Sequence, residues 1–417
     1  MTTPKPRPWL FALTGVPYGV GGSFVSYLMP YFATHANIHL DEIGWYTTLL
    51  FVPTWFQFLY APVIDLGPSR RHWLIILSVL GGVCFAAACM MPLPEQLGPF
   101  LLLAFLGQVL SGLVGSCNGG LMATTIPDDQ RGVAGGAYNI GNLSGGALSA
   151  AVIIFMTAAE VAPYLIAIVM VLLMIAPSLA VFALHEPPRV RSASPFSAML
   201  REVGAVIFSK SGLTGIALCI SPVGTAALSN SFTGMTTDYD AGGTLVGVIN
   251  GPANALLTAF GSFVGGKLCD RYNRRGMYLM SGVLTAICAL IMSVSPHDQS
   301  TYAFGVSAYY LVMGLCFASF TSAVLETIGH GDAAAATKYT LFTAAGNVAI
   351  AYVNLVDTRF YDSKTFDLIW TDVSWGNVDS MLRVDALLNI AGVMVLGCVF
   401  WYLGSFGRTK HVHEQLP

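Results

Sequence analysis

Charged residues are scarce in this chain, and they are almost missing from its long apolar stretches. Charged side chains make up 10% of the residues and apolar side chains 55%, whereas about a quarter of the residues of an average soluble domain are charged. The net charge is only −3, and basic residues cluster only at the ends of apolar stretches. These properties exclude a nucleic-acid-binding protein and indicate a protein whose solvent is largely lipid.

Enzyme motifs are lacking as well. The chain contains neither a His-Glu-x-x-His zinc pattern nor a Gly-x-Ser-x-Gly nucleophile elbow. Residues 261–267 fit part of a phosphate-binding loop, but Leu268 replaces the Ser or Thr that this loop requires. We therefore expect no enzymatic activity, no catalytic residue, no metal site and no cofactor.

Apolar segments of about twenty residues are what the chain has in abundance. Each can cross a hydrocarbon core of about 30 Å at about 1.5 Å per residue. The segments cover residues 9–34, 41–66, 73–93, 98–126, 132–157, 160–184, 213–235, 242–268, 276–295, 301–328, 336–357 and 383–405. They predict an all-α membrane protein with twelve transmembrane helices.

The distribution of basic residues predicts the orientation in the membrane. Of the 19 lysine and arginine residues, all except Arg359, Lys364 and Arg383 fall in the tails or in the loops of one side. Basic loops stay in the cytoplasm. We expect a multi-pass protein of the cytoplasmic (inner) membrane of a bacterium, with both termini in the cytoplasm.

A long basic link divides the predicted spans into two sets of six. We expect a first half over residues 1–184, a cytoplasmic link over 185–212 and a second half over 213–417. Apolar residues recur within the link at helical spacing, which predicts an amphipathic helix on the inner membrane surface. These residues are Phe196, Met199, Leu200, Val203 and Ile207.

The two halves repeat one pattern, an aspartate at the inner end of their second span followed by a pair of arginines. The residues of this repeat are Asp65, Arg70 and Arg71 in the first half, and Gly266, Asp270, Arg271, Arg274 and Arg275 in the second. Such an aspartate can pair with an arginine four residues away or cap the N-terminus of a neighbouring helix. The glycine allows that helix to approach closely.

The second copy resembles the signature of the major facilitator superfamily, which reads glycine, three residues, Asp-Arg and a pair of arginines. The resemblance implies two pseudo-symmetric six-helix bundles with a solute cavity between them near the midplane. It also implies that the repeat residues form a cytoplasmic gate that latches the halves together. The alternative is that these charges only fix the topology at helix ends.

The first half resembles a narrower branch over residues 12–75. Gly-Val-Pro at 15–17, Tyr-Ala-Pro-Val-Ile-Asp at 60–65 and Arg-Arg-His-Trp at 70–73 are similar to motifs of the AmpG-type muropeptide permeases and acetyl-coenzyme A transporters. This branch implies import of a solute. The fourth span departs from it, because residues 116–124 contain no acidic residue.

Polar residues within the spans indicate which helices line a cavity, because such groups are costly when they face lipid. The candidate cavity residues are Tyr18, Ser23, Tyr27, Gln108, Asn118, Asn139, Asn142, Thr225, Asn230, Asn250, Asn254, Asn347 and Asn354. The alternative for each is a hydrogen bond between helices that only holds the bundle together, which contributes about 0.6 kcal/mol.

Ionisable residues are missing from the middle of every predicted span. Glu326 comes nearest, about two residues from the inner end of the tenth span, and is the only candidate proton relay. The alternative is a carboxylate that reaches the inner surface beside His330 and Lys338. The sequence therefore predicts either facilitated diffusion or a proton coupling that depends wholly on Glu326.

Together these patterns predict a monomeric secondary transporter in the lipid bilayer that moves a small organic solute by alternating access. The transport is either coupled to a proton or independent of it. The competing hypothesis is a non-transporting membrane sensor or scaffold that retains the carrier fold. The outer loop over 358–380 is acidic and aromatic. It is either a lid over the outer mouth or a segment anchored at the membrane interface.

Overall fold

The computed structural model describes residues 7–66, 68–187, 204, 208, 210–329, 334–362 and 378–402, and these parts are helical with short connections. The helices of the first half are η1 (Pro8–Leu10), α1 (Phe11–Thr14), α2 (Val16–Ser23), η2 (Phe24–Leu28), α3 (Met29–His35), α4 (Leu40–Trp55), α5 (Gln57–Tyr60), α6 (Pro62–Leu66), α7 (Arg70–Cys89), α8 (Leu97–Thr125), η3 (Asp128–Gln130), α9 (Arg131–Asn139), η4 (Ile140–Gly145), α10 (Gly146–Ala158), α11 (Pro163–Ser178) and η5 (Leu179–Ala183).

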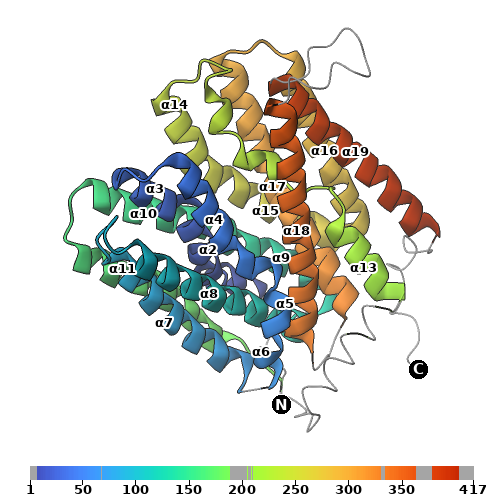
Figure 1. Ribbon diagram of the computed structural model, residues 1–417. Helices are drawn as coiled ribbons and strands as arrows, with labels where there is room; N and C mark the ends of the chain where they lie inside the picture. Colours follow the sequence, from blue (N-terminus) through green and yellow to red (C-terminus); the bar gives the residue numbers. More distant parts are fainter. Residues whose placement is uncertain are drawn as a thin grey trace.

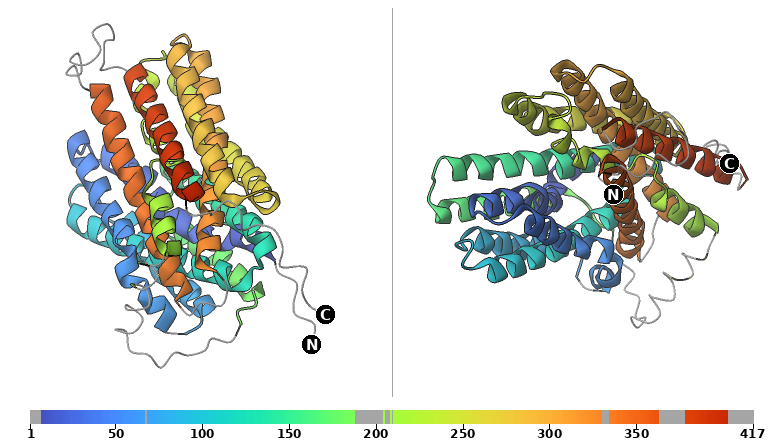
Figure 2. Two further views of the ribbon diagram at one scale, coloured as in Figure 1. Left: turned by 90° about the vertical axis from the view of Figure 1, so that its right-hand side faces the viewer. Right: turned by 45° about the horizontal axis from the view of Figure 1, so that its top comes forward.

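The second half continues the same architecture. Its helices are α13 (Lys210–Ile220), η6 (Ala227–Asn230), η7 (Gly234–Thr236), α14 (Gly243–Val248), η8 (Ile249–Ala253), α15 (Asn254–Arg271), α16 (Arg274–Val294), α17 (Gln299–Ile328), α18 (Ala335–Asp362) and α19 (Val378–Tyr402). The first-half helices gather on one side of the molecule and the second-half helices on the other (Figure 1), and the right-hand view of Figure 2 shows the same separation.

Within the described residues, eight helices are long and apolar enough to cross a membrane, and a bent pair, Glu42–Trp55 with Gln57–Leu66, makes a ninth if it is one span. The segments predicted as the first, seventh and eighth spans are interrupted by short 3-10 or π-helical pieces. The expected number of twelve therefore remains an interpretation. Most of the 185–212 link and residues 363–377 of the outer loop lie outside the described residues.

Proline residues account for two of the interruptions. Pro53 lies inside α4, where it removes a helical N–H, and the chain bends by 45° at the following break. Pro222 follows α13, and Gly224 then adopts a φ of 59°. The broken backbone is satisfied by side chains, because the Gly224 N–H donates to Asn389 Oδ1 at 2.8 Å. Such compensation is required where water is excluded.

The buried apolar residues of the two halves form a shared cluster at one end of the molecule. One cluster contains residues of both halves, such as Leu121 and Leu325. The other two clusters each belong to one half, around Phe24 in the first and Tyr302 in the second. We call the end with the shared cluster the inner end, because it also holds Asp65 and the other residues that the charge pattern places in the cytoplasm.

Candidate functional site: an inner latch and a cavity between the halves

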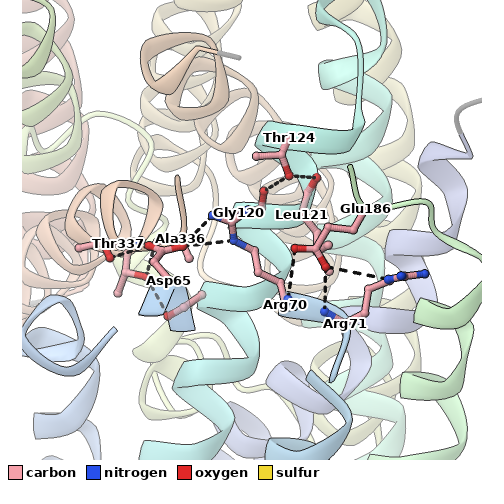
Figure 3. Close-up of polar contacts among 11 residues, drawn as sticks. Asp65, Arg70, Arg71, Gly120, Leu121, Thr124, Glu186, Ala336 and Thr337 are labelled. Carbon is pink, nitrogen blue, oxygen red and sulfur yellow. Dashed lines mark hydrogen bonds and ion pairs between the residues drawn. The ribbon is translucent and has the colours of Figure 1, made fainter. Parts of the chain in front are cut away.

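The first copy of the repeat connects the halves through Asp65. Its Oδ2 accepts hydrogen bonds from the backbone N–H and the hydroxyl of Thr337, at 2.9 and 2.7 Å, so it caps the start of α18 (Figure 3). Its Oδ1 pairs with Arg70 at 2.7 Å, and both side chains are almost fully buried. A Cβ at Gly120 would lie 2.6 Å from Arg70 Nε. Only glycine therefore leaves room for this arginine.

The second copy makes the equivalent contact from the other half. Asp270 at the end of α15 accepts hydrogen bonds from the backbone N–H groups of Gly132 and Val133 at 2.6 and 2.8 Å, so it caps α9 of the first half. Arg274 lies 3.5 Å from Asp270 and also donates to the carbonyl of Asp128 across the halves. Carboxylates are favourable at helix N-termini. We call the Asp65 and Asp270 contacts the inner latch.

Close backbone packing supports the latch. A Cβ at Gly266 would lie 2.7 Å from the carbonyl oxygen of Gly132, and a Cβ at Gly132 would collide with Gly266 in turn. Arg131 is 1% exposed and donates to the Leu325 carbonyl of the other half at 2.7 Å. No role for Arg131 is predicted from the sequence, because its only visible signal there is its position at a helix start.

Three predicted gate residues lie outside these contacts between halves. Arg71 donates to Leu184 O at 3.1 Å within the first half. The Arg271 guanidinium lies 5.8 Å from the ring of its neighbour Tyr272, and that of Arg275 lies 5.6 Å from the ring of Phe400. These contacts stay within one half.

A cavity of about 80 Å³ lies between the halves, which is room for a few water molecules or part of a small solute. Its lining comes from both halves and includes the predicted residues Tyr18, Asn139, Asn142, Thr225 and Asn347. Among the described residues, no charged side chain lines it. The walls offer amides, hydroxyls and aromatic faces, which suits a polar but uncharged solute.

The two halves meet across this cavity through polar and aromatic contacts. Tyr138 lies edge-on to Tyr339 of the second half, with ring centroids 6.4 Å apart, and Tyr18 stacks on Tyr138, with ring centroids 6.2 Å apart. Asn139 Nδ2 donates to Phe317 O at 3.0 Å and to Thr321 Oγ1 at 2.9 Å. A solute that binds here would contact both halves at once.

The other predicted cavity residues do not line this cavity. They are Ser23, Tyr27, Gln108, Asn118, Asn230, Asn250, Asn254 and Asn354. Several make hydrogen bonds within one half. Asn118 donates to Thr14 O at 2.8 Å, Asn250 bonds with the hydroxyls of Tyr302 and Tyr310, and Asn254 accepts from Thr258 at 2.9 Å.

Several lining residues were missed by the sequence prediction. Most are aromatic or hydroxyl side chains, which occur in every span and carry little signal by themselves. They are Gln57, Tyr278, Phe317, Phe320, Thr321, Tyr339 and Thr343. Gln57 had the clearest signal, an amide inside the second predicted span, where it bonds with Ser116 at 3.0 Å.

Two carboxylates are buried inside the second half, although the predicted boundaries place both at or near span ends. Asp357 and Asp385 are both 0% exposed, because α18 runs on to Asp362 and α19 begins at Val378, beyond the predicted boundaries. Glu326, in contrast, has a side chain 25% exposed and lies 3.8 Å from Arg274. It belongs to the inner latch region and does not line the cavity.

The sequence matches the profile of the Major Facilitator Superfamily over residues 11–353. A comparison with curated proteins gives no match. Among solved structures, the chain is similar to the human organic anion transporter MFSD10, with 15% identity, a TM-score of 0.63 and coverage of 93% of this chain and 97% of that one.

Two sugar symporters have similar structures. The E. coli fucose:proton symporter FucP shares 11% identity and a TM-score of 0.64, covering 94% of this chain and 99% of that one. The proton:xylose symporter XylE shares 12% identity and a TM-score of 0.68, covering 95% and 94%. At such identities the similarity shows a common fold.

Proposed function

Since the chain belongs to the major facilitator superfamily, we propose that it is a secondary transporter that moves a small organic solute across the cytoplasmic membrane by alternating access. The observation that carries the proposal is the uncharged cavity lined by both halves, next to a latch that closes one end. A non-transporting scaffold needs neither feature.

The lining favours an uncharged or weakly charged solute that is rich in hydroxyl or amide groups. Asn142 and Asn347 provide amides, and Tyr18 and Tyr138 provide aromatic faces, against which the apolar face of a sugar ring can pack. No charged side chain of the described lining would hold a strongly anionic solute. The resemblance of residues 12–75 to the muropeptide permease branch supports import of a sugar-containing metabolite.

Ligand stabilisation and uptake test this proposal together. The purified protein is screened by thermal unfolding against a panel of neutral sugars, amino sugars and small glycopeptides, because a ligand of the folded state raises the melting temperature. We expect at least one compound to stabilise the protein and to enter proteoliposomes that contain it. Stabilisation without uptake would favour a sensor. If no compound of the panel stabilises the protein or is taken up, the proposed solute class is contradicted.

The proposed topology predicts which segments reach each side of the membrane. A cysteine at position 194 of the link is expected to resist an impermeant thiol reagent added to intact cells, whereas one at position 368 of the outer loop is expected to react. A background without the native cysteines provides the control. Labelling of position 194 from outside would reverse the topology.

The placement of Glu326 predicts that it is not the proton relay. Its contact with Arg274 is a partly exposed ion pair, and such pairs contribute about 0.2–1 kcal/mol. Glu326→Gln should therefore reduce pH-gradient-driven accumulation of a stabilising solute by less than about fivefold. The measurement is accumulation in proteoliposomes with an acidic exterior. If the Glu326→Gln protein still equilibrates the solute but no longer accumulates it, Glu326 is the relay after all.

A further inference from the structure

Two fully buried aspartates lie on the packed helices α18 and α19 of the second half, outside the cavity. Asp357 of α18 and Asp385 of α19 are both 0% exposed and lie close enough for their charges to interact. Neither carboxylate forms an ion pair with any described residue, and neither lines the cavity. Two buried anions without a cation would repel each other strongly.

The hydrogen-bond partners of these carboxylates are incomplete. Both side-chain oxygens of Asp357 and Oδ1 of Asp385 have no partner among the described residues. The hydroxyl of Tyr309 on α17 is also without a partner, although the tyrosine is 1% exposed and lies near both aspartates. Buried polar groups are rarely left without a hydrogen-bond partner. This indicates that at least one of the two carboxyls carries a proton.

The neighbouring ionisable groups supply no positive charge. Cys316 of α17 and Cys288 of α16 are the other titratable groups near Tyr309, and thiols carry no positive charge. Arg359 and Arg383 each lie two residues from an aspartate, which is about 200° around the helix axis. Each arginine therefore projects from the opposite side of its helix.

We propose that Asp357 and Asp385 form a proton-binding site that holds one shared proton between them. The proton comes from water and is held as an O–H group on one of the two carboxyls. One proton removes the repulsion without any further charge. Proton binding itself does not depend on the transport function proposed above. Only the coupling of the proton to solute transport rests on that proposed function.

A chain of contacts connects this site with the cavity. Asn389 lies one turn after Asp385 and its Nδ2 is 3.4 Å from Asp385 Oδ2, while its Oδ1 accepts from the Gly224 N–H at 2.8 Å. Gly224 lies in the break after α13 and lines the cavity. Protonation of the pair can therefore influence the cavity wall, which would couple proton binding to solute binding.

Thermal unfolding as a function of pH tests the site without any solute. The folded state holds one proton more than the unfolded state, whose aspartates are ionised, so stability falls as pH rises. The unfolding equilibrium constant should increase about tenfold per pH unit within the range where this difference persists. Asp357→Asn and Asp385→Asn each mimic the protonated form. Both should flatten this dependence and raise the melting temperature at about pH 9.

Asp379→Asn is the matched control. Asp379 begins the same helix as Asp385, but it is partly exposed and lies 3.0 Å from His297 Nε2. We expect this variant to keep the wild-type slope above about pH 8. Tyr309→Phe, which removes the nearby hydroxyl, should shift the pH range without abolishing the slope.

A second measurement keeps the proposal testable if the asparagine variants do not fold. The infrared spectrum of the wild-type protein should contain the band of a protonated, buried carboxyl group at neutral pH and lose it at high pH. Its absence at neutral pH would overturn the proposal. Stabilisation at high pH by sodium but not by choline would also overturn it, because the pair would then bind a metal cation.

The pH and infrared results do not depend on transport. A protonated pair in a protein that takes up no solute would refute the transport function and leave the site in place. If uptake is found but the pH dependence and the infrared band are missing, the site is refuted and the transporter remains.

Discussion

Replacing Asp270 with asparagine is expected to shift the protein away from the state in which its inner end is closed, by about 10- to 150-fold in the ratio of closed to open molecules. The carboxylate accepts hydrogen bonds from Gly132 N and Val133 N. Asparagine keeps one acceptor oxygen but loses the charge. Hydrogen bonds to charged groups contribute about 1.5–3 kcal/mol, and the contact exists only while the halves are joined.

The distance between the halves at the inner end reports this shift directly. Spin labels are attached to cysteines placed at Asp129 and Tyr272, which are exposed on opposite halves, in a background without native cysteines. We expect the distance distribution of Asp270→Asn to gain a population of longer distances. Uptake of a stabilising solute should fall in parallel, because alternating access requires both closed states.

Asp298→Asn is the control for this substitution. Asp298 also caps a helix, accepting from Thr301 N at 2.7 Å, but the contact lies within one half. That hydrogen bond lowers the pKa of the Asp298 carboxyl, so the control removes a carboxylate that is ionised at neutral pH as well. An Asp270→Asn protein with the parental distance distribution would show that the aspartate only fixes topology.

The sequence predicts the latch aspartates but not the helices that they cap. Asp65 and Asp270 are recognisable because each copy of the repeat consists of residues close together in sequence, at the loop after the second span of its half. Their partners at Gly132 and Thr337 carry no local signal, since the contact depends on how two bundles meet. Sequence alone identifies the capping group, and tertiary structure identifies the capped helix.

The difference between local sequence pattern and tertiary contact also explains why the buried carboxylates and several cavity residues were not predicted correctly. Asp357 and Asp385 stand near the ends of predicted spans, and a shift of several residues in a helix boundary moves them from the surface into the bundle. The polar residues of the spans divide between the cavity and contacts within one half. Asn347 and Asn254 look alike in sequence, and only their neighbours decide which of them reaches the cavity.

Asn347→Ala is expected to weaken binding of the stabilising solute by about 5- to 150-fold. Asn347 is an amide of the second half that lines an uncharged cavity together with Tyr18 of the first half. Loss of its side chain leaves a polar group of the bound solute without a partner, at a cost of about 1–3 kcal/mol. The dissociation constant, obtained from the melting temperature as a function of solute concentration, measures this loss.

Asn254→Ala provides the comparison that makes this result specific to the cavity. Asn254 accepts from Thr258 at 2.9 Å and does not line the cavity, so its loss should lower the melting temperature of the solute-free protein and leave the dissociation constant within about twofold. Equal weakening of binding by both variants would mean that Asn347 acts through general stability. A selective effect of Asn347→Ala, with unchanged inner-end distances, would place recognition in the cavity and closure in the latch, because each substitution would then change one of the two steps.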